Sequence, residues 1–458
     1  MSSFTTSQSD ALCGIHRWLW VPPDKAGILF GDPGTGKTAT VGALLRQLLE
    51  GLPGSLQLNK HEILFCAPTN RAVQVGLNAL AKHGVTTIQG WTIARLLGLR
   101  EHTDPSGKQH FKPVKEGPAK LDPAIRLLVI DEASMIGREL LGWLVDMLQS
   151  APLSVHVLFI GDPNQLPPVG EDRSPVFTFS DNAVERWKLT EVVRHQGPIL
   201  KAAQRVLHQP TGRPSFHDLA DGESLEVVPT SQRFYRLFRK EIAQDPEAGG
   251  CVQLLAWRNK TVDKAAGIAR RTLFGANAPR IVDGELLVAT NPVYASGDEG
   301  DTDIVASTSS RLRVLSSRIK TVFIGGSNPL KVYETCALDI DADEFITFNV
   351  VHDDHRRAYE AELRELARFI RGVRDPEKAR QLWREEYYPA KRWDAPVRSA
   401  SAMTVHRAQG STINTVFLDL QDIDLARRAD DLFRRLVYTG LTRASKRLVI
   451  LDPTAPLN

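Results

Sequence analysis

The stretch AGILFGDPGTGKTATVGALLRQLLEG, residues 26–51, decides the fold class of this chain of 458 residues. Its apolar beginning, residues 26–30, predicts a buried strand, its centre fits the pattern GxxxxGK[ST], and its end has the apolar spacing of a helix. A strand, a glycine-rich loop and a helix in this order form a P-loop, in which backbone N–H groups and the helix N-terminus surround a phosphate. The stretch therefore predicts an α/β protein that binds a nucleotide.

The residue types of the P-loop predict how it holds a triphosphate. Glycines let the backbone amides turn inward, the lysine reaches the β- and γ-phosphates, and the threonine hydroxyl after it can ligate Mg²⁺. The residues that we expect to contact the nucleotide here are Gly34, Thr35, Gly36, Lys37 and Thr38.

A pair of acidic residues follows a second apolar run. Leu127–Ile130 reads as a strand buried in a parallel sheet, and it ends in Asp131 and Glu132. Strand ends are where α/β sheets bind ligands. We expect Asp131 to hold Mg²⁺ and Glu132 to orient or deprotonate the attacking water, which favours hydrolysis over nucleotide storage.

Length and composition agree with a multidomain globular protein. The chain is about three times a typical domain of roughly 150 residues, 42% of its residues are hydrophobic, and its net charge is only +3. The four cysteines form no CxxC pair, which indicates neither a zinc ribbon nor a disulfide framework. No apolar run approaches the roughly 18 residues of a membrane span, and the first residues lack the pattern of a secretory signal. We expect a cytoplasmic protein, of a bacterial or phage-infected cell, with no membrane partner.

The segment GDPNQLPPVG, residues 161–170, follows a third apolar strand at residues 155–160. It resembles the coupling motif of superfamily 1 helicases, in particular the RecD-like branch of superfamily 1B that includes the phage Dda helicase. The resemblance implies that ATP and Mg²⁺ bind between two domains, and that Gln165 senses the γ-phosphate.

Further segments of the first half are similar to motifs of the same family. Residues 4–8, FTTSQ, resemble its adenine-reading segment, in which Gln8 would pair with the base. Residues 67–72, APTNRA, resemble a motif that grips the single-strand backbone. Residues 87–89, TIQ, resemble the neighbouring TIH motif, with Gln89 in place of histidine. The residues that this resemblance assigns to nucleic acid are Pro68, Thr69, Asn70, Thr87 and Gln89.

The second half resembles the family's remaining motifs. Arg194, at the end of LTEVVR, and Arg443, in a segment similar to motif VI, would supply arginines to the γ-phosphate, Arg443 as an arginine finger. Residues 401–412 resemble motif V, and residues 251–260 resemble the strand that opens the second domain. The resemblance places Gln409 and Gly410 near the nucleotide, and Thr404, His406 and Asn259 near nucleic acid. For Asn259, an ordinary loop asparagine with no role in binding is an equally good interpretation.

Two inserts interrupt the expected domains. Residues 100–114 read as a β-hairpin with a turn at residues 104–107, which the resemblance makes a strand-separating pin; Phe111 could stack on a base, and an ordinary surface hairpin is the alternative. Residues 282–351 read as short strands of a small barrel. Two helices follow, the second ending at Pro389, with arginines and tryptophans suited to nucleic acid or to a plain solvated surface.

The expected architecture is therefore α/β, with two RecA-like P-loop NTPase domains. The first spans residues 1–190 with a β-hairpin insert at 95–118, and the second spans residues 191–458 with an SH3-like barrel and helical tower at 285–399. The resemblance implies an ATP-dependent DNA helicase that moves 5′ to 3′ on single-stranded DNA and unwinds duplex DNA. It implies single-stranded and fork DNA as partners, replication or recombination proteins as further ones, and a functional monomer.

Three alternatives remain open from the residues. One is an RNA-directed motor of the same superfamily, because no residue read here distinguishes the two sugars. Another is a RecD-like subunit of a nuclease complex, although no nuclease carboxylate cluster is recognisable. The third is an ATP-dependent switch or scaffold without motor activity, against which the complete hydrolytic set argues.

Overall fold

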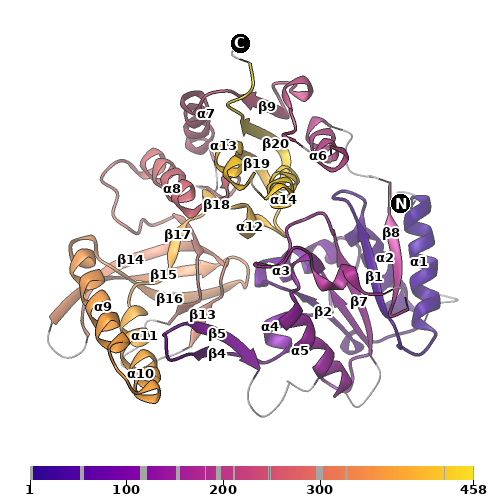
Figure 1. Cartoon of the computed structure of the whole chain (residues 1–458), viewed down its shortest axis with the longest axis horizontal. Coiled ribbons are helices and arrows are strands. Elements are labelled where there is room, and N and C mark those ends of the chain that lie inside the picture. The colour runs from indigo at the N-terminus through magenta and orange to yellow at the C-terminus, as the bar shows by residue number, and fades with distance from the viewer. Residues whose placement is uncertain are drawn as a thin grey trace.

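The computed structural model describes residues 4–51, 56–113, 121–150, 155–180, 182–191, 197–209, 212–245, 247, 249–295, 303–324, 328–427 and 429–456. Among these residues, no helix combines the length and apolar character needed to cross a lipid bilayer. Two parallel sheets and one antiparallel sheet organise the chain (Figure 1).

The first domain is built on a six-stranded parallel sheet with the strand order β3-β2-β6-β7-β1-β8. Its strands are β1 (Ala26–Gly31), β2 (Ile63–Ala67), β3 (Gln89–Thr92), β6 (Leu127–Ile130), β7 (His156–Gly161) and β8 (Val184–Leu189). Its helices are α1 (Thr6–Leu19), α2 (Lys37–Glu50), α3 (Asn70–Ala81), α4 (Ile93–Leu96) and α5 (Arg138–Gln149). The three strands predicted from their apolar runs are present, and β2, β6 and β7 are almost wholly buried because helices cover both faces.

The second domain contains a five-stranded parallel sheet with the order β18-β10-β19-β20-β9. Its strands are β9 (Leu225–Val228), β10 (Val252–Ala256), β18 (Ala402–Thr404), β19 (Ile413–Asp419) and β20 (Ala444–Leu451). Its helices are α6 (Pro198–His208), α7 (Ser231–Ala243), α8 (Asn259–Phe274), α12 (Val405–Ala408), α13 (Leu420–Ile423) and α14 (Asp430–Leu441). Two α/β domains with parallel sheets are thus present, as the sequence predicted.

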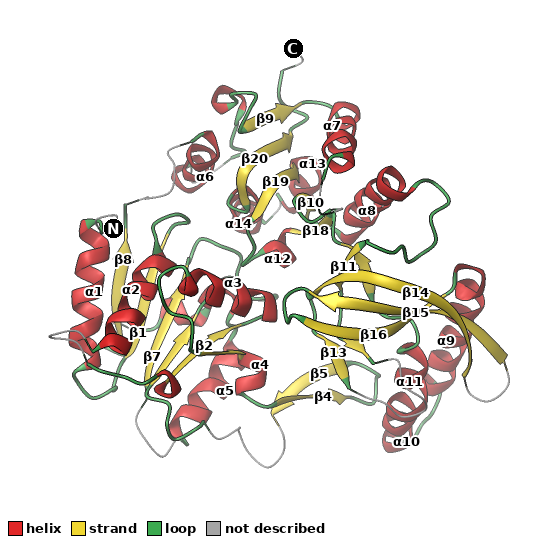
Figure 2. Cartoon of the chain, turned by 180° about the vertical axis from the view of Figure 1, so that it is seen from behind, coloured by secondary structure: helices red, strands yellow, loops and turns green. Residues whose placement is uncertain are grey.

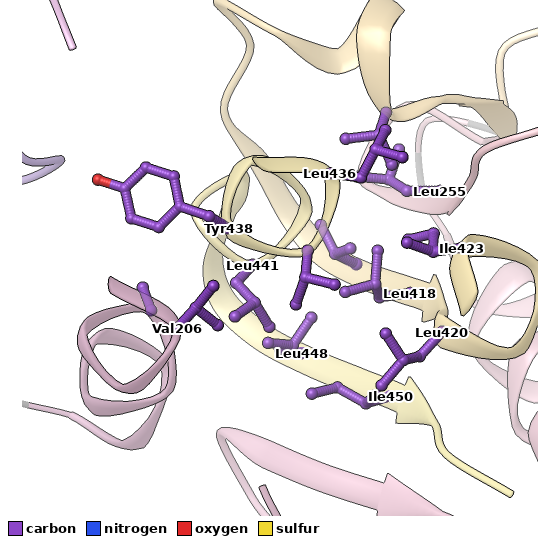
Figure 3. Packing of buried hydrophobic residues seen from close by; sticks show 14 of the residues in the cluster. Val206, Leu255, Leu418, Leu420, Ile423, Leu436, Tyr438, Leu441, Leu448 and Ile450 are labelled. Carbon is purple, nitrogen blue, oxygen red and sulfur yellow. The ribbon is translucent and has the colours of Figure 1, made fainter. Parts of the chain in front are cut away.

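The core between this second sheet and helices α6, α12 and α14 also receives a residue of the first domain. Figure 3 shows Leu418, Leu448 and Ile450 of the sheet packed beneath Leu436 and Leu441 of α14. Leu166, from the loop after β7, is fully buried in the same cluster. The two domains are therefore joined by apolar packing as well as by the chain.

An antiparallel sheet with the order β16-β15-β14-β11-β17 is inserted in the second domain. Its strands are β11 (Leu286–Ala289), β14 (Arg311–Ile324), β15 (Asn328–Asp339), β16 (Glu344–Val351) and β17 (Val397–Ser399), with a separate pair β12 (Val293–Tyr294) and β13 (Ile304–Ala306). The short strands expected at residues 312–315 and 320–324 are halves of the single long strand β14. A register shift between Val314 and Ser316 lets the strand continue through its polar middle.

Three helical segments pack beside this sheet: α9 (Arg356–Arg371), α10 (Pro376–Leu382) and α11 (Tyr388–Lys391), the last two joined by a π-helical turn at Trp383–Tyr387. Pro389 does not end the helix as predicted. It lies in the first turn of α11, where a missing N–H is tolerated, and the helix continues to Lys391.

The predicted hairpin is present as β4 (Leu99–Thr103) and β5 (Gln109–Pro113). Asp104 closes its turn by accepting hydrogen bonds from the backbone N–H groups of Ser106 and Lys108, each 2.9 Å long. Both cartoons show the hairpin extending from the first domain to the helices α10 and α11 (Figures 1 and 2). Residues 114–118 of the predicted insert lie outside the described residues.

Candidate nucleotide-binding site and nucleic-acid interface

The P-loop connects β1 to α2 and has the backbone that its glycines require. Gly34 and Gly36 both have φ of 83°, in the left-handed region that disfavours side chains. The Nζ atom of Lys37 donates to the carbonyl oxygens of Gly31, at 2.5 Å, and Asp32, at 3.1 Å. The lysine therefore lies folded over the loop, where a phosphate can take the place of these carbonyl groups.

The acidic pair lies at the end of β6, two strands away from β1 in the sheet. Burial raises the pKa of Asp131, while a hydrogen bond from the Glu132 N–H and the charge of Lys37 lower it. Burial, with the charge of Asp131, raises the pKa of Glu132 to about 7, and Arg443 and Lys37 lower it. Glu132 also has a φ of 53°. A carboxyl group with a pKa near neutrality suits a general base, and a strained backbone is frequent at functional sites.

The loop after β7 joins the P-loop to the second domain. Asn164 donates to Asp32 at 3.2 Å, and the buried Asp162 accepts a hydrogen bond from the Tyr438 hydroxyl at 2.8 Å. The side chain of Gln165 is buried and its Nε2 lies 3.5 Å from Asp162, while its Oε1 has no hydrogen-bond partner. The Gln165 amide is therefore only weakly held and lies close to the P-loop side of the cleft.

Residues of the second domain face the acidic pair across the cleft. Gln409 donates to the Ser134 hydroxyl at 2.9 Å and to the Leu166 carbonyl at 3.3 Å. Gly410 has a φ of 75°, and a Cβ atom on it would lie 3.6 Å from Oε1 of Glu132. The buried Arg443 donates to the carbonyl oxygens of Thr439 and Ser411, both at 3.2 Å. The structure thus brings Gln409, Gly410 and Arg443 to the predicted hydrolytic residues.

Gln8 reaches the P-loop from the start of α1. Its Nε2 donates to the Thr35 carbonyl at 3.0 Å, and its Oε1 accepts from the Thr5 N–H at 3.0 Å. Both ends of the amide are thus engaged within the protein, so bidentate pairing with adenine requires both hydrogen bonds to be exchanged. Arg194, expected to contact the γ-phosphate, lies outside the described residues.

The donor set at the P-loop fits one Mg²⁺ ion. Mg²⁺ in such sites takes one or two protein oxygens, together with phosphate oxygens and water. Thr38 lies in the first turn of α2, and Asp131 has a carboxylate oxygen besides the one that accepts from Glu132.

The segment predicted to grip nucleic acid in the first domain follows β2. Thr69 caps α3 by accepting from the Ala72 N–H at 3.2 Å, and Asn70 donates to the Ser307 hydroxyl of the inserted sheet at 2.9 Å. Pro68 precedes them at the carboxyl end of the strand. The contact between Asn70 and Ser307 joins the first domain to the insert.

The structure does not bring Thr87 and Gln89 to this segment. Gln89 starts β3 and pairs with Leu64, whereas Thr92 at the end of β3 pairs with Ala67. Three residues of a strand span about 10 Å, so Gln89 lies far from the carboxyl edge. Thr92 repeats the Thr-Ile pair of residues 87–88 and occupies the edge, where it caps α4 by accepting from the Arg95 N–H at 3.1 Å. Thr92 was not predicted at this edge, because the sequence alone does not fix where a strand ends.

The corresponding residues of the second domain gather at the carboxyl edge of its sheet. Thr404 ends β18, pairs with Ala256 and caps α12. Asn259 begins α8 just after β10 and is exposed. His406 is half-buried, and burial lowers its pKa, which favours the neutral imidazole. Thr404, His406 and Asn259 therefore lie at one sheet edge.

The hairpin meets the helical insert at its tip. The Trp383 indole N–H donates to the Pro105 carbonyl at 3.3 Å, and the Tyr388 hydroxyl donates to the Gly107 carbonyl. Phe111 remains 47% exposed and lines a cavity of about 270 Å³ with Tyr294 and Arg392. Phe111 is thus available for stacking.

Two interface residues were not predicted. Arg435 is buried and donates to the carbonyl oxygens of Pro163, at 2.7 Å, and Gln165, at 2.9 Å. Tyr438 lies three residues later on the same face of α14, so helical spacing was the available signal.

Two protein families match this chain: the AAA domain family over residues 7–230, and the UvrD-like helicase C-terminal domain family over residues 399–451. The ATP-dependent DNA helicase dda of Enterobacteria phage T4 is 25% identical, over 90% of this chain and 91% of that protein. The ATP-dependent RecD2 DNA helicase of Deinococcus radiodurans is 36% identical over 98% of this chain, which spans 48% of that protein. A crystal structure of Pif1 helicase from Candida albicans is 15% identical, with 99% and 95% of the two chains covered and a TM-score of 0.48.

Proposed function

We propose that this chain is a superfamily 1B helicase, and specifically an ATP-dependent DNA helicase that moves 5′ to 3′ on single-stranded DNA and unwinds duplex DNA. The observation that carries the proposal is the meeting of the two domains at Glu132, with Lys37 on one side and Gly410 on the other. A nucleotide bound there contacts both domains, so its hydrolysis changes how they close.

The roles within the cleft follow from these positions. Lys37 holds the β- and γ-phosphates, Glu132 accepts the proton of the attacking water, and Arg443 stabilises negative charge on the transferring phosphoryl group. Thr38 and Asp131 would hold Mg²⁺, which neutralises phosphate charge when it is bound. Gln165 links the γ-phosphate to the second domain through the backbone contact of its carbonyl with Arg435. Arg194 keeps its proposed role at the γ-phosphate.

The proposed path of the single strand crosses the carboxyl edges of both sheets. Pro68, Thr69 and Asn70 lie at one edge, and Thr404, His406 and Asn259 lie at the other. Because each edge belongs to a different domain, closure of the cleft shortens the distance between two grips on one strand. We extend the proposal to Thr92 and withdraw it from Thr87 and Gln89, which lie away from the edge.

The two inserts complete the proposal. The hairpin β4–β5 is the proposed pin, and the antiparallel sheet with α9–α11 is the proposed SH3-like barrel and tower. The proposed domain boundary lies near residue 190, because β8 ends the first sheet at Leu189 and α6 packs on the second core.

Unwinding of a fluorescent duplex with either a 5′ or a 3′ single-stranded tail, followed together with phosphate release, tests this function. We expect unwinding of the 5′-tailed duplex alone. Lys37→Ala should abolish both signals, whereas Lys60→Ala, at an exposed residue before β2, should retain them. Stimulation of phosphate release by an RNA strand but not by its DNA counterpart would turn the assignment to an RNA motor, and no stimulation by either would leave an ATP switch.

A further inference from the structure

Positive charge is concentrated in the helical insert. Residues 356–392 contain eleven arginines and lysines against seven aspartates and glutamates, a net charge of +4, whereas the whole chain carries +3. The remaining residues are therefore slightly acidic. Because the net positive charge lies on one small element, the surface of that element can attract a polyanion even though the whole protein is weakly charged.

One face of α9 carries three of these cations. Arg364, Arg368 and Arg371 follow one another at spacings of four and three residues, so they share a face. Together with Tyr387 of the π-helical turn, the apolar Leu363 and Ala367 and one acidic residue, Glu360, they line an open groove of about 440 Å³, which we call the arginine groove. The groove combines guanidinium groups with an aromatic ring, the residue types that contact phosphates and bases.

The arginines of the groove are poorly neutralised. Within the described residues, Arg368 and Arg371 have no acidic partner, and Arg364 lies 3.9 Å from Glu360, which bonds Arg356 at 2.8 Å. Elsewhere in the insert, Arg380 pairs with Glu377 at 2.7 Å and Arg384 pairs with Glu385 at 2.5 Å, whereas Arg357 and Arg374 have no ion pair among the described residues. The groove therefore presents two arginines, Arg368 and Arg371, whose charge no acidic side chain of the described residues neutralises.

The arginine groove leads to the tip of the hairpin. Arg371 lies 6.0 Å from the ring centroid of Trp383, and the indole of Trp383 contacts Pro105 in the hairpin turn. Figures 1 and 2 both show α9 and α10 beside the tip of the β4–β5 pair. The row of cations therefore ends next to the hairpin tip.

We propose that the arginine groove binds the phosphate backbone of duplex DNA ahead of the hairpin and so orients the junction on the tip; this inference rests on the proposed function. The seven residue-to-residue steps from Arg364 to Arg371 rise about 10 Å along the helix, which equals about three base-pair steps of a duplex strand. Guanidinium groups recognise phosphate without reading sequence. The groove thus adds a contact with the duplex to the grips on the single strand.

Fluorescence anisotropy without ATP tests the groove on three probes: a 5′-tailed duplex whose other strand has no tail, the same duplex with blunt ends, and the tail alone. The variant is Arg368→Ala/Arg371→Ala. The matched control is Arg236→Ala/Arg239→Ala, which removes two exposed arginines at the same spacing from α7, a helix apart from the helical insert (Figure 1). A second variant, Arg368→Lys/Arg371→Lys, keeps the charge.

We expect the alanine variant to bind the tailed and blunt duplexes roughly tenfold more weakly, and its plot of log K against log salt to lose a slope of about 1.8, the value for two phosphate contacts. Binding of the tail alone should stay unchanged, which also shows that the variant is folded. The lysine variant and the α7 control should retain most of the duplex affinity.

Three results would overturn the proposal: unchanged affinity for both duplexes, equal weakening on the tail alone, or equal weakening in the α7 control. The second result would assign the groove to the single strand, and the third would indicate a general effect of net charge. The proposed function fails separately, when the parent protein shows no DNA-stimulated phosphate release, because these binding measurements need no hydrolysis.

Discussion

The hydroxyl group of Tyr438 lies 2.8 Å from Oδ2 of Asp162, which joins the last helix of the second domain to the loop after β7 in the first. Both residues are buried, and Lys37 lies close enough to Asp162 to lower its pKa against the larger effect of burial, which raises it. A change in how the two domains close therefore alters the hydrogen bond to Asp162, which lies beside Lys37 of the P-loop.

Tyr438→Phe should lower turnover more than it changes the KM for ATP. The substitution removes the donor to a buried carboxylate and costs about 1–3 kcal/mol of interaction. We expect kcat of the DNA-stimulated ATPase to fall roughly tenfold. Tyr235→Phe, at a buried tyrosine on α7, is the control and should leave kcat unchanged. Equal losses in both variants would show that the effect is only one of stability.

The pH dependence of ATP hydrolysis should follow Glu132. Because burial raises the pKa of Glu132 to about 7, the carboxylate that accepts a proton is the minor form in acid. The kcat/KM for ATP should therefore rise about tenfold per pH unit below pH 7 and level off above it. Glu132→Gln should lose a factor of roughly 100 to 10,000 in kcat and retain nucleotide binding. Any pH dependence that remains in Glu132→Gln reports the ionisation of ATP itself. If Glu132→Gln kept the same pH profile as the parent protein, Glu132 would not be the group that titrates.

Gly107→Ala should separate DNA unwinding from ATP hydrolysis. Gly107 has a φ of 85°, and a Cβ atom there would lie 2.5 Å from the Trp383 ring, so the substitution displaces the hairpin tip from α10 and its π-helical turn. We expect unwinding to fall several-fold while hydrolysis stimulated by single strands persists. Gly142→Ala on α5 makes the same change where nothing lies within 4 Å, and should retain both activities. Parallel loss of both activities in Gly107→Ala would make the hairpin purely structural.

Leu166→Ala should weaken the link between the domains as well as the fold. Leu166 is fully buried in the second core although it belongs to the first domain, and its truncation should cost about 2–5 kcal/mol. Leu448→Ala in the same core should cost a similar amount. At a temperature where both variants are folded, only Leu166→Ala should reduce the stimulation of ATPase by DNA. Thermal unfolding and ATPase assays distinguish the two effects, and equal stimulation in both variants would contradict a coupling role.

The sequence by itself determined the local chemistry of the cleft. The pattern GxxxxGKT, between an apolar strand and a segment with the apolar periodicity of a helix, is sufficient to predict the P-loop. A glycine-rich loop followed by a helix N-terminus binds phosphate through its own backbone N–H groups. An apolar run that ends in Asp131 and Glu132 likewise marks a strand end. These features depend on neighbours in the chain, so a linear pattern contains them.

Only the tertiary structure decided how the motifs meet. The register of β3 against β2 places Thr92 rather than Gln89 at the carboxyl edge. The register of so short a strand cannot be predicted from its sequence. The contacts of Arg435 and Tyr438 with the loop after β7 join residues more than 270 positions apart. The contact between the hairpin tip and Trp383 likewise joins residues far apart in the chain. The unpaired arginines on α9 also could not be predicted, because whether a charge is neutralised depends on which side chains the fold brings within reach.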